Sequence, residues 1–419
     1  MTTFDWRTFV KRLPQRMWFR LVVFAGGALL LVVVASAAGP YLPSAVSVDF
    51  GQDAAMRILQ ILATSMLAVT TFSLTAMISA YAGAAQGTTP RATQLLVADR
   101  TSQNALSTFL GSFVFSIVGI VALSTDSFTE RGRSVLFLGT LAVIALVVGT
   151  LLRWIHHLTG FGRVPDVIDR VEAAASHAVR AYVRSPHLGG VAPVAVSDGT
   201  RALLSERVGY VTGVDIGRLQ RIADAAGATV HVDALPGAFV GRGTSLARVV
   251  GALDDEGAAG VGWAFRVEKH RTYEQDPRLG LIALAEIGSR ALSPAVNDPG
   301  TAIVVLGAVE RVVTELLTGE ASDGESRFSR VHVPALSLGD LVEDAFRPLA
   351  RDGAGMVEVA LRMQKVLGDL ARIADGDHER EVFLRASVRA CARAVRVLAD
   401  PGDAELVEAA AAEVASERR

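Results

Sequence analysis

The sequence predicts an α-helical membrane protein with four transmembrane helices and a cytoplasmic α+β domain that becomes helical toward its C-terminus. Two observations predict this fold class. Four apolar segments in the N-terminal part of the 419-residue chain reach the roughly 20 residues that a helix needs to cross a bilayer core. The rest of the chain mixes short β-rich runs with helical patterns, and basic residues gather on one side of the predicted membrane.

The four predicted spans have no Asp, Glu, Lys or Arg near their middles, so their helices are compatible with lipid. They cover residues 17–39, 54–80, 105–124 and 134–158, within a predicted four-helix transmembrane domain at 1–163. The first span has a second interpretation, because Ala35-Ser36-Ala37 resembles a signal-peptidase site behind a charged region and an apolar run. The run reaches spanning length, which favours a retained helix. Cleavage leaves three spans in the same orientation.

Basic residues predict the orientation of the spans, since cytoplasmic flanks carry an excess of Lys and Arg. One set of flanks holds most of them: Arg7, Lys11, Arg12, Arg16, Arg20, Arg91, Arg100, Arg153 and Arg163. The opposite loops hold Arg131 and Arg133, which are outnumbered, so both termini are expected in the cytoplasm. Residues 81–104, which join the second and third spans on that side, fit either a short helix on the membrane surface or a plain loop.

The soluble part is predicted to hold a small α/β or barrel-like module at 164–272 and a mainly helical module at 273–419. Strand-like runs occupy residues 191–196, 208–211, 228–232 and 261–267, with a helix at 216–226. Further helices are predicted at 276–291, 298–318, 337–350, 355–374 and 377–399, with a weaker one at 403–416 and a strand at 328–333. Asp276-Pro277 and Asp298-Pro299 fit the N-cap and first position of two helices.

Three stretches of sequence resemble a known family. They are HRTYEQDPR from His270, GLIALAEI from Gly280, and RALSPAVNDPGTA from Arg290. Thr89-Pro90-Arg91 with Asp99-Arg100, and Gly209-Tyr210-Val211 followed by Pro236 to Val240, match it as well. The chain is similar to the bacterial predicted-membrane-protein family called domain of unknown function 2254, and departs from its pattern at Val296 and Gly300. The resemblance implies a bacterial inner-membrane protein and supplies no established activity.

The second span carries a stripe of hydroxyl side chains on one helical face. Its members are Thr64, Thr71, Thr75 and Ser79. In an oligomer, rings of such hydroxyls are able to line an ion-conducting path. The alternative is helix packing, because small hydroxyl residues let helices approach and form hydrogen bonds across the contact. A single four-span chain without central charges does not form a pore by itself, so a channel requires several copies.

A second group of polar residues lies between 274 and 298, around the starts of two predicted helices. The candidate ligand-binding residues are Glu274, Asp276, Arg278, Arg290, Asn297 and Asp298. The carboxylates at the helix starts fit a cation, and the two arginines fit an anion. The alternative is a structural lock, in which helix caps and Arg–carboxylate pairs fix two helices and a loop.

The sequence also argues against several classes of function. It contains no Walker loop, no G-x-G-x-x-G after a strand, no H-E-x-x-H and no G-x-S-x-G, so we expect no enzymatic activity and no cofactor. The histidines lack the spacing of metal ligands, which predicts scattered surface histidines and no metal site. The net charge of −2 gives no basic field for nucleic acid. Cys391 is the one cysteine, so no internal disulfide forms.

These patterns favour an oligomeric ion channel or channel-like protein in which the cytoplasmic domain assembles and gates the path. Its expected partners are the lipid bilayer, further copies of the chain and inorganic ions. The alternative is a membrane-anchored cytoplasmic sensor or scaffold that binds a ligand or a partner protein through residues 274–301.

Overall fold

The computed structural model describes residues 17–38, 52–97, 99–125, 130–195, 200–320 and 327–416. The chain divides into two compact units. The first unit comprises Met1–Gln86 and Gln94–Asp166, and the second comprises Gly87–Thr93 and Val167–Arg419. Part of the predicted orientation rests on basic residues that lie outside the described residues, namely Arg7, Lys11, Arg12 and Arg16.

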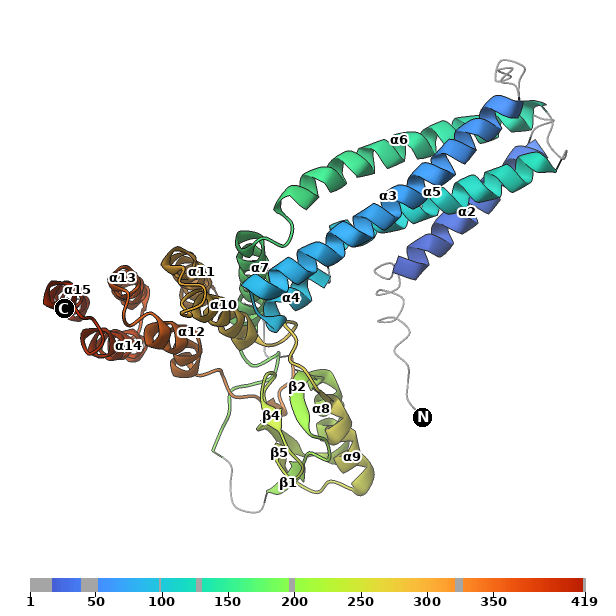
Figure 1. Ribbon diagram of the computed structural model, residues 1–419. Coiled ribbons are helices and arrows are strands. Elements are labelled where there is room, and N and C mark those ends of the chain that lie inside the picture. The colour runs from blue at the N-terminus through green and yellow to red at the C-terminus, as the bar shows by residue number, and fades with distance from the viewer. Residues whose placement is uncertain are drawn as a thin grey trace. The chain divides into compact units, whose positions relative to one another are not determined.

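Four long helices of the first unit run alongside one another (Figure 1). They are α2 (Met17–Ala38), α3 (Gln52–Gly87), α5 (Arg100–Ser124) and α6 (Glu130–Gly160). Among the described residues, three stretches are long and apolar enough to cross a membrane: Ala54–Gly87, Arg100–Ser124 and Gly132–Gly160. Of α2, only Val22–Val34 counts as an apolar helix within the described residues, and it is shorter than a span. Three predicted spans therefore have matching helices, and the first span stays a prediction.

The core of the first unit surrounds α5. Phe109 of α5 and Trp154 of α6 are almost fully buried, and the Trp154 indole donates a hydrogen bond of 2.9 Å to the Ser73 hydroxyl on α3. Gly111 lies so close to α2 that a Cβ atom there would meet the Phe24 ring at 2.4 Å. The segment between α3 and α5 contains a helix, α4 (Pro90–Val97), rather than only a loop; its location at a membrane surface stays a prediction.

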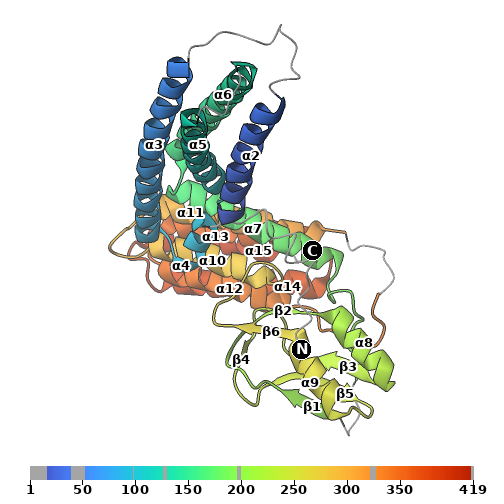
Figure 2. The same ribbon diagram turned by 90° about the vertical axis from the view of Figure 1, so that its right-hand side faces the viewer.

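The long segment of the second unit begins within α7 (Val164–Arg184), at Val167, and continues into two small sheets. The strands are β1 (Arg201–Leu204), β2 (Gly209–Val214), β3 (Thr229–Val232), β4 (Phe239–Val240), β5 (Ser245–Val250), β6 (Phe265–Glu268) and β7 (Val331–His332). One sheet has the order β1-β5-β3-β7 and the other β4-β2-β6. Helices α8 (Ile216–Ala226) and α9 (Asp255–Ala264) accompany the strands, and Figure 2 shows them beside the sheets.

Two strand predictions need correction. Of the run 191–195, only Val191 pairs, in an isolated bridge with His332; Val196 lies outside the described residues. In the run 261–267 the first four residues end helix α9, which Asp254 caps by accepting a hydrogen bond from the Gly257 amide. The cap starts a helix before the apolar run, so β6 begins only at Phe265. The predictions for 208–211 and 228–232 overlap β2 and β3.

The remainder of the second unit is a packed set of helices. They are α10 (Pro277–Ala291), α11 (Pro299–Thr318), α12 (Leu338–Asp352), α13 (Val357–Ile373), α14 (Asp377–Val395) and α15 (Pro401–Ser416). The predicted caps of α10 and α11 are confirmed, because Asp276 accepts from the Leu279 amide and Asp298 from the Thr301 amide. β7, between α11 and α12, pairs in parallel with β3. The helical part and the α/β part thus share one sheet, and the predicted module boundary at 272 stays a prediction.

Candidate functional site

The predicted hydroxyl stripe lies on an exposed face of α3. Thr64, Thr71, Thr75 and Ser79 are all exposed. Three of the hydroxyls donate to carbonyls one turn earlier on the same helix, at 3.0 Å for Thr64, Thr71 and Thr75. Their hydrogens are thus satisfied without a neighbouring helix, and their oxygen lone pairs still face outward.

The exposed stripe is longer than the four predicted residues. At steps of three or four residues it continues through Arg57, Gln60, Ala68, Ala82 and Gln86, all of them exposed. Arg57 and Gln86 lie about 43 Å apart along the helix axis, so they reach beyond a hydrocarbon core of ~30 Å at both ends. Thr64 and Ser79 lie about 22 Å apart, within that thickness. Arg57 is the charged member of this stripe.

Hydroxyls on α5 behave differently. Thr108, Ser112 and Ser116 also donate to carbonyls four residues earlier, but all three are buried between neighbouring helices. Small polar residues in that position allow close helix packing. In the first unit, packing therefore accounts for these hydroxyls of α5 and leaves the stripe hydroxyls of α3, Thr64, Thr71, Thr75 and Ser79, without a described neighbour on their outward side.

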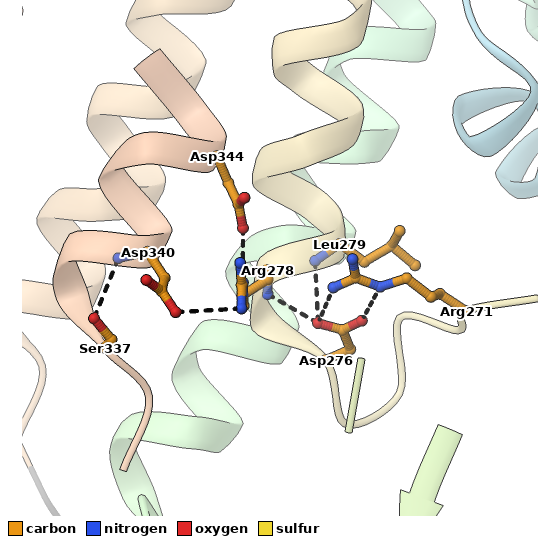
Figure 3. A network of polar contacts seen from close by, with 7 residues as sticks. All are labelled: Arg271, Asp276, Arg278, Leu279, Ser337, Asp340 and Asp344. Carbon is orange, nitrogen blue, oxygen red and sulfur yellow. Dashed lines mark hydrogen bonds and ion pairs between the residues drawn. The ribbon is translucent and has the colours of Figure 1, made fainter. Parts of the chain in front are cut away.

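In the second unit, Asp276 is buried at the start of α10, and hydrogen bonds fix its carboxylate. Its side chain is 2% exposed, and its carboxylate accepts two hydrogen bonds from Arg271, at 2.6 and 2.9 Å. It also accepts from the backbone amides of Arg278 and Leu279 (Figure 3). A carboxylate with four donors has no vacant position for a ligand.

The Arg278 guanidinium ties α10 to α12. Its Nε donates to Asp344 at 2.7 Å, and its Nη1 lies 3.6 Å from Asp340 (Figure 3). The hydrogen bond to Asp344 raises the pKa of Arg278 above its usual value. Asp340 lies in the first turn of α12, which Ser337 caps. Arg278 therefore joins two helix starts.

The same region holds residues 87–93 against α10. Arg91 forms an ion pair with Glu286, and its backbone carbonyl accepts a hydrogen bond of 3.1 Å from the Tyr273 hydroxyl. Burial, and then the nearby Glu286 carboxylate, raise the pKa of Tyr273 above its usual value, so the phenol stays a donor. These contacts connect two separate stretches that carry the family resemblance.

The remaining candidates lie at the far end of α10. Arg290 is about 18 Å along the helix from Arg278, so the two arginines do not converge on one anion. Asn297 is exposed and has the left-handed φ of 50° that a tight turn requires. Asp298 is exposed and caps α11, and its bond from the Thr301 hydroxyl lowers the pKa of the carboxyl. The structure thus brings Asp276 and Arg278 together and separates both from Arg290, Asn297 and Asp298.

Glu274 differs from the other candidates because it lines an open cleft of about 720 Å³. The Glu274 carboxylate accepts a hydrogen bond of 3.0 Å from Arg266 on β6. Tyr182 of α7, whose pKa burial raises, and the exposed ring of Trp263 also line the cleft. A concave, partly aromatic surface of this size is typical of ligand sites.

One pair in the first unit has no counterpart in the predictions. The His157 imidazole lies 3.0 Å from the Asp99 carboxylate, and Asp99 is 8% exposed. Asp99 also caps α5 by accepting from the Ser102 amide. The prediction of surface histidines is wrong for His231, which is 5% exposed, and for His157, whose side chain is 18% exposed. The described residues contain no group of three or more His, Cys, Asp or Glu that fits a metal ion.

Comparisons with known proteins give the family of the chain. The family model described as "Predicted membrane protein (DUF2254)" matches residues 14–369. Uncharacterized proteins of Mycobacterium bovis (Mb1321c) and Mycobacterium tuberculosis (Rv1290c) are each 27% identical over 335 residues, covering 75% of this chain and 63% of theirs. The chain therefore spans less than two thirds of the length of these relatives. No solved structure matches. The chain belongs to the predicted membrane protein family DUF2254.

Proposed function

We propose that this protein is a homo-oligomeric channel-like membrane protein in which the α3 stripes of several copies face a common path. The observation that carries the proposal is the exposure of Thr64, Thr71, Thr75 and Ser79 on a helix suited to span a membrane. The second unit would lie in the cytoplasm of a bacterium and assemble and gate the path. The arginines at 91, 100, 153 and 163 support this orientation in the inner membrane.

The chemistry of the stripe supports a path between copies. The inner face of α3 packs through Leu62 and Met66 against the rest of the first unit, so a polar lining has to come from the outer face. Hydroxyl oxygens from several copies would form neutral polar rings. Because Arg57 is the charged residue of the stripe, a ring of arginines would stand at one mouth, and we expect anions to pass better than cations.

Ion flux from liposomes that contain the purified full-length protein tests the proposal, with Cl⁻ and K⁺ gradients measured separately. We expect Cl⁻ flux, and we expect Thr71→Leu with Thr75→Leu to reduce it by roughly tenfold or more, because two hydroxyl rings become apolar. Leu74→Val, which lies beside the stripe, is the matched control. Flux that is absent in the wild type, or equal in the double variant and the control, would refute the path.

The Glu274 cleft supports a second candidate function, a membrane-anchored sensor or scaffold. Its size, the Tyr182 and Trp263 rings and the Glu274–Arg266 pair suit a ligand with both polar and apolar parts. A thermal-shift screen of the full-length protein in detergent tests this candidate. A ligand that raises the melting temperature of the wild type but not of Trp263→Ala supports it. Hits that stabilise both proteins equally would count against the cleft.

A further inference from the structure

Helices α12 and α14 lie side by side in the second unit (Figure 2). A groove of about 250 Å³ lies between them. Its lining residues are Val342, Glu343, Phe346, Arg347, Ala350, Ala386, Arg389, Ala390 and Arg393. The groove shares no lining residue with the Glu274 cleft. Neither the α3 stripe nor the cleft accounts for it.

The floor of this arginine groove is apolar. Phe346 and Val342 of α12 are 2% and 3% exposed, and Ala390 of α14 is 7% exposed. These side chains belong to the contact between the two helices. They are already shielded from water, so the gain from an apolar ligand group here comes from that group leaving water and packing against them.

The rim of the arginine groove is strongly basic. Arg347, Arg389 and Arg393 supply three guanidinium groups, whereas Glu343 is the single carboxylate among the lining residues. Glu343 is already shared, because it forms an ion pair with Arg389 and lies 3.7 Å from Arg347. Arg393 forms no ion pair and no side-chain hydrogen bond with any described residue. The rim thus has a formal excess of two positive charges, and one arginine has all its donors free.

We propose that the arginine groove binds a small soluble phosphate monoester that carries a compact apolar group. Arginine presents paired N–H donors that match phosphate oxygens in geometry, and a phosphate dianion balances the two excess charges. The apolar group of the ligand lies on Phe346, Val342 and Ala390. This site is independent of the proposed channel function, and binding there does not require ion conduction.

The size of the groove selects the kind of phosphate compound. Its volume is below the ~300–1,000 Å³ that is typical of pockets for drug-sized ligands. It accommodates a phosphate with one small ring or a short chain. The two acyl chains of a phospholipid exceed this volume, so the ligand is a soluble compound rather than a membrane lipid.

Calorimetric titration of the full-length protein in a nonionic detergent tests the site, with phenyl phosphate as the probe. We expect phenyl phosphate to bind and Arg393→Ala to weaken binding by roughly tenfold to a hundredfold, since a charge-assisted bond is lost. Arg393→Ala removes no partnered group, so its melting temperature should equal that of the wild type. Arg385→Ala is the matched control, because Arg385 lies two turns before Arg393 and pairs with Glu381 outside the groove.

Four further measurements complete the test. Inorganic phosphate should bind several-fold more weakly than phenyl phosphate, because it lacks the apolar ring. Phenol should show no saturable binding, because it lacks the phosphate. Arg393→Lys should recover part of the affinity. Equal binding by Arg393→Ala and Arg385→Ala would overturn the proposal. Binding to vesicles with phosphatidic acid that exceeds binding of phenyl phosphate would overturn it in favour of a lipid site.

Discussion

The outer face of α3 and the start of α10 both concentrate polar side chains, yet their surroundings differ. At α10, Asp276 is 2% exposed and accepts from Arg271 and two backbone amides. On α3, the hydroxyls of Thr71 and Thr75 donate to carbonyls of their own helix, and both residues are exposed. A polar group that is buried with all its partners stabilises the fold, whereas an exposed polar stripe on an apolar helix still has capacity for contacts. Exposure, rather than the density of polar residues, therefore separates the two regions.

The same difference in exposure distinguishes the two hypotheses about residues 274–301, a ligand site and a structural lock. Asp276 and Arg278 are used in contacts that fix α10 to its neighbours, as a structural lock requires. Glu274 is the exception, because it lies in the open cleft. Any ligand of this region would therefore meet Glu274 and not the Asp276 carboxylate.

The largest effect is expected at Asp276. Asp276→Ala leaves Arg271 without its carboxylate and α10 without its cap, so the full-length protein should lose about 3–5 kcal/mol of stability. Asp298→Ala is the matched control, because Asp298 caps α11 from an exposed position and its loss should cost about 1 kcal/mol. Thermal unfolding followed by circular dichroism measures both. Equal losses for the two variants would show that the Arg271 pair adds nothing to the cap.

A smaller effect is expected at Arg278, whose side chain is 32% exposed. Arg278→Ala breaks the bond to Asp344 and should destabilise the protein by about 1–2 kcal/mol. Arg290→Ala at the other end of α10 should leave stability unchanged within about 0.5 kcal/mol, because that arginine is exposed. Chemical denaturation distinguishes the two. A larger loss from Arg290→Ala would contradict the assignment of the lock to the start of α10.

A modest acid sensitivity is expected from the β3–β7 pairing. His231 is 5% exposed and stacks on His332 with ring centroids 4.5 Å apart. Burial first, then His332 and Arg248, lower the pKa of His231, and Asp233 opposes them. In the unfolded chain this histidine binds a proton below its ordinary pKa of ~6.5, whereas folded His231 stays neutral down to its lowered pKa. The stability of the fold therefore decreases as the pH drops from the ordinary pKa through the lowered one.

The matched measurement is the melting temperature of the wild type and of His231→Gln between pH 7.5 and about 5. We expect the wild type to lose more stability than the variant over this interval. A parallel decline of both proteins would exclude His231 as the cause.

Several elements were predictable because their signals are local. The apolar runs predicted α3, α5 and α6, and the Asp-Pro pairs predicted the starts of α10 and α11. β1 and β5 were missed because short strands are defined by distant partners, such as Arg201 opposite Val249. The Asp99–His157 pair joins residues 58 positions apart for the same reason.

The α3 stripe was predicted only in its middle. The four hydroxyl residues are recognisable in the sequence because they are polar within an apolar helix. Alanines such as Ala68 and Ala82 occur both at helix contacts and on exposed helix faces, so their sequence does not assign them to the stripe. Whether Arg57 and Gln86 share the open face depends on where α5 and α6 pack, which local sequence does not specify. The sequence therefore predicts that a stripe exists, but how far it extends depends on the tertiary packing of the helices.

Cross-linking between copies of α3 tests the central claim most directly. Cys391 is the one cysteine, so Cys391→Ser gives a cysteine-free chain into which Thr75→Cys or Leu74→Cys is introduced. The two positions are adjacent in sequence but about 100° apart around the helix. In bacterial membranes treated with a bis-maleimide, we predict cross-linked dimers for Thr75→Cys and few for Leu74→Cys, because one thiol per chain allows each chain only one cross-link. Equal or absent cross-linking at both positions would contradict the claim that the stripe faces further copies of the chain.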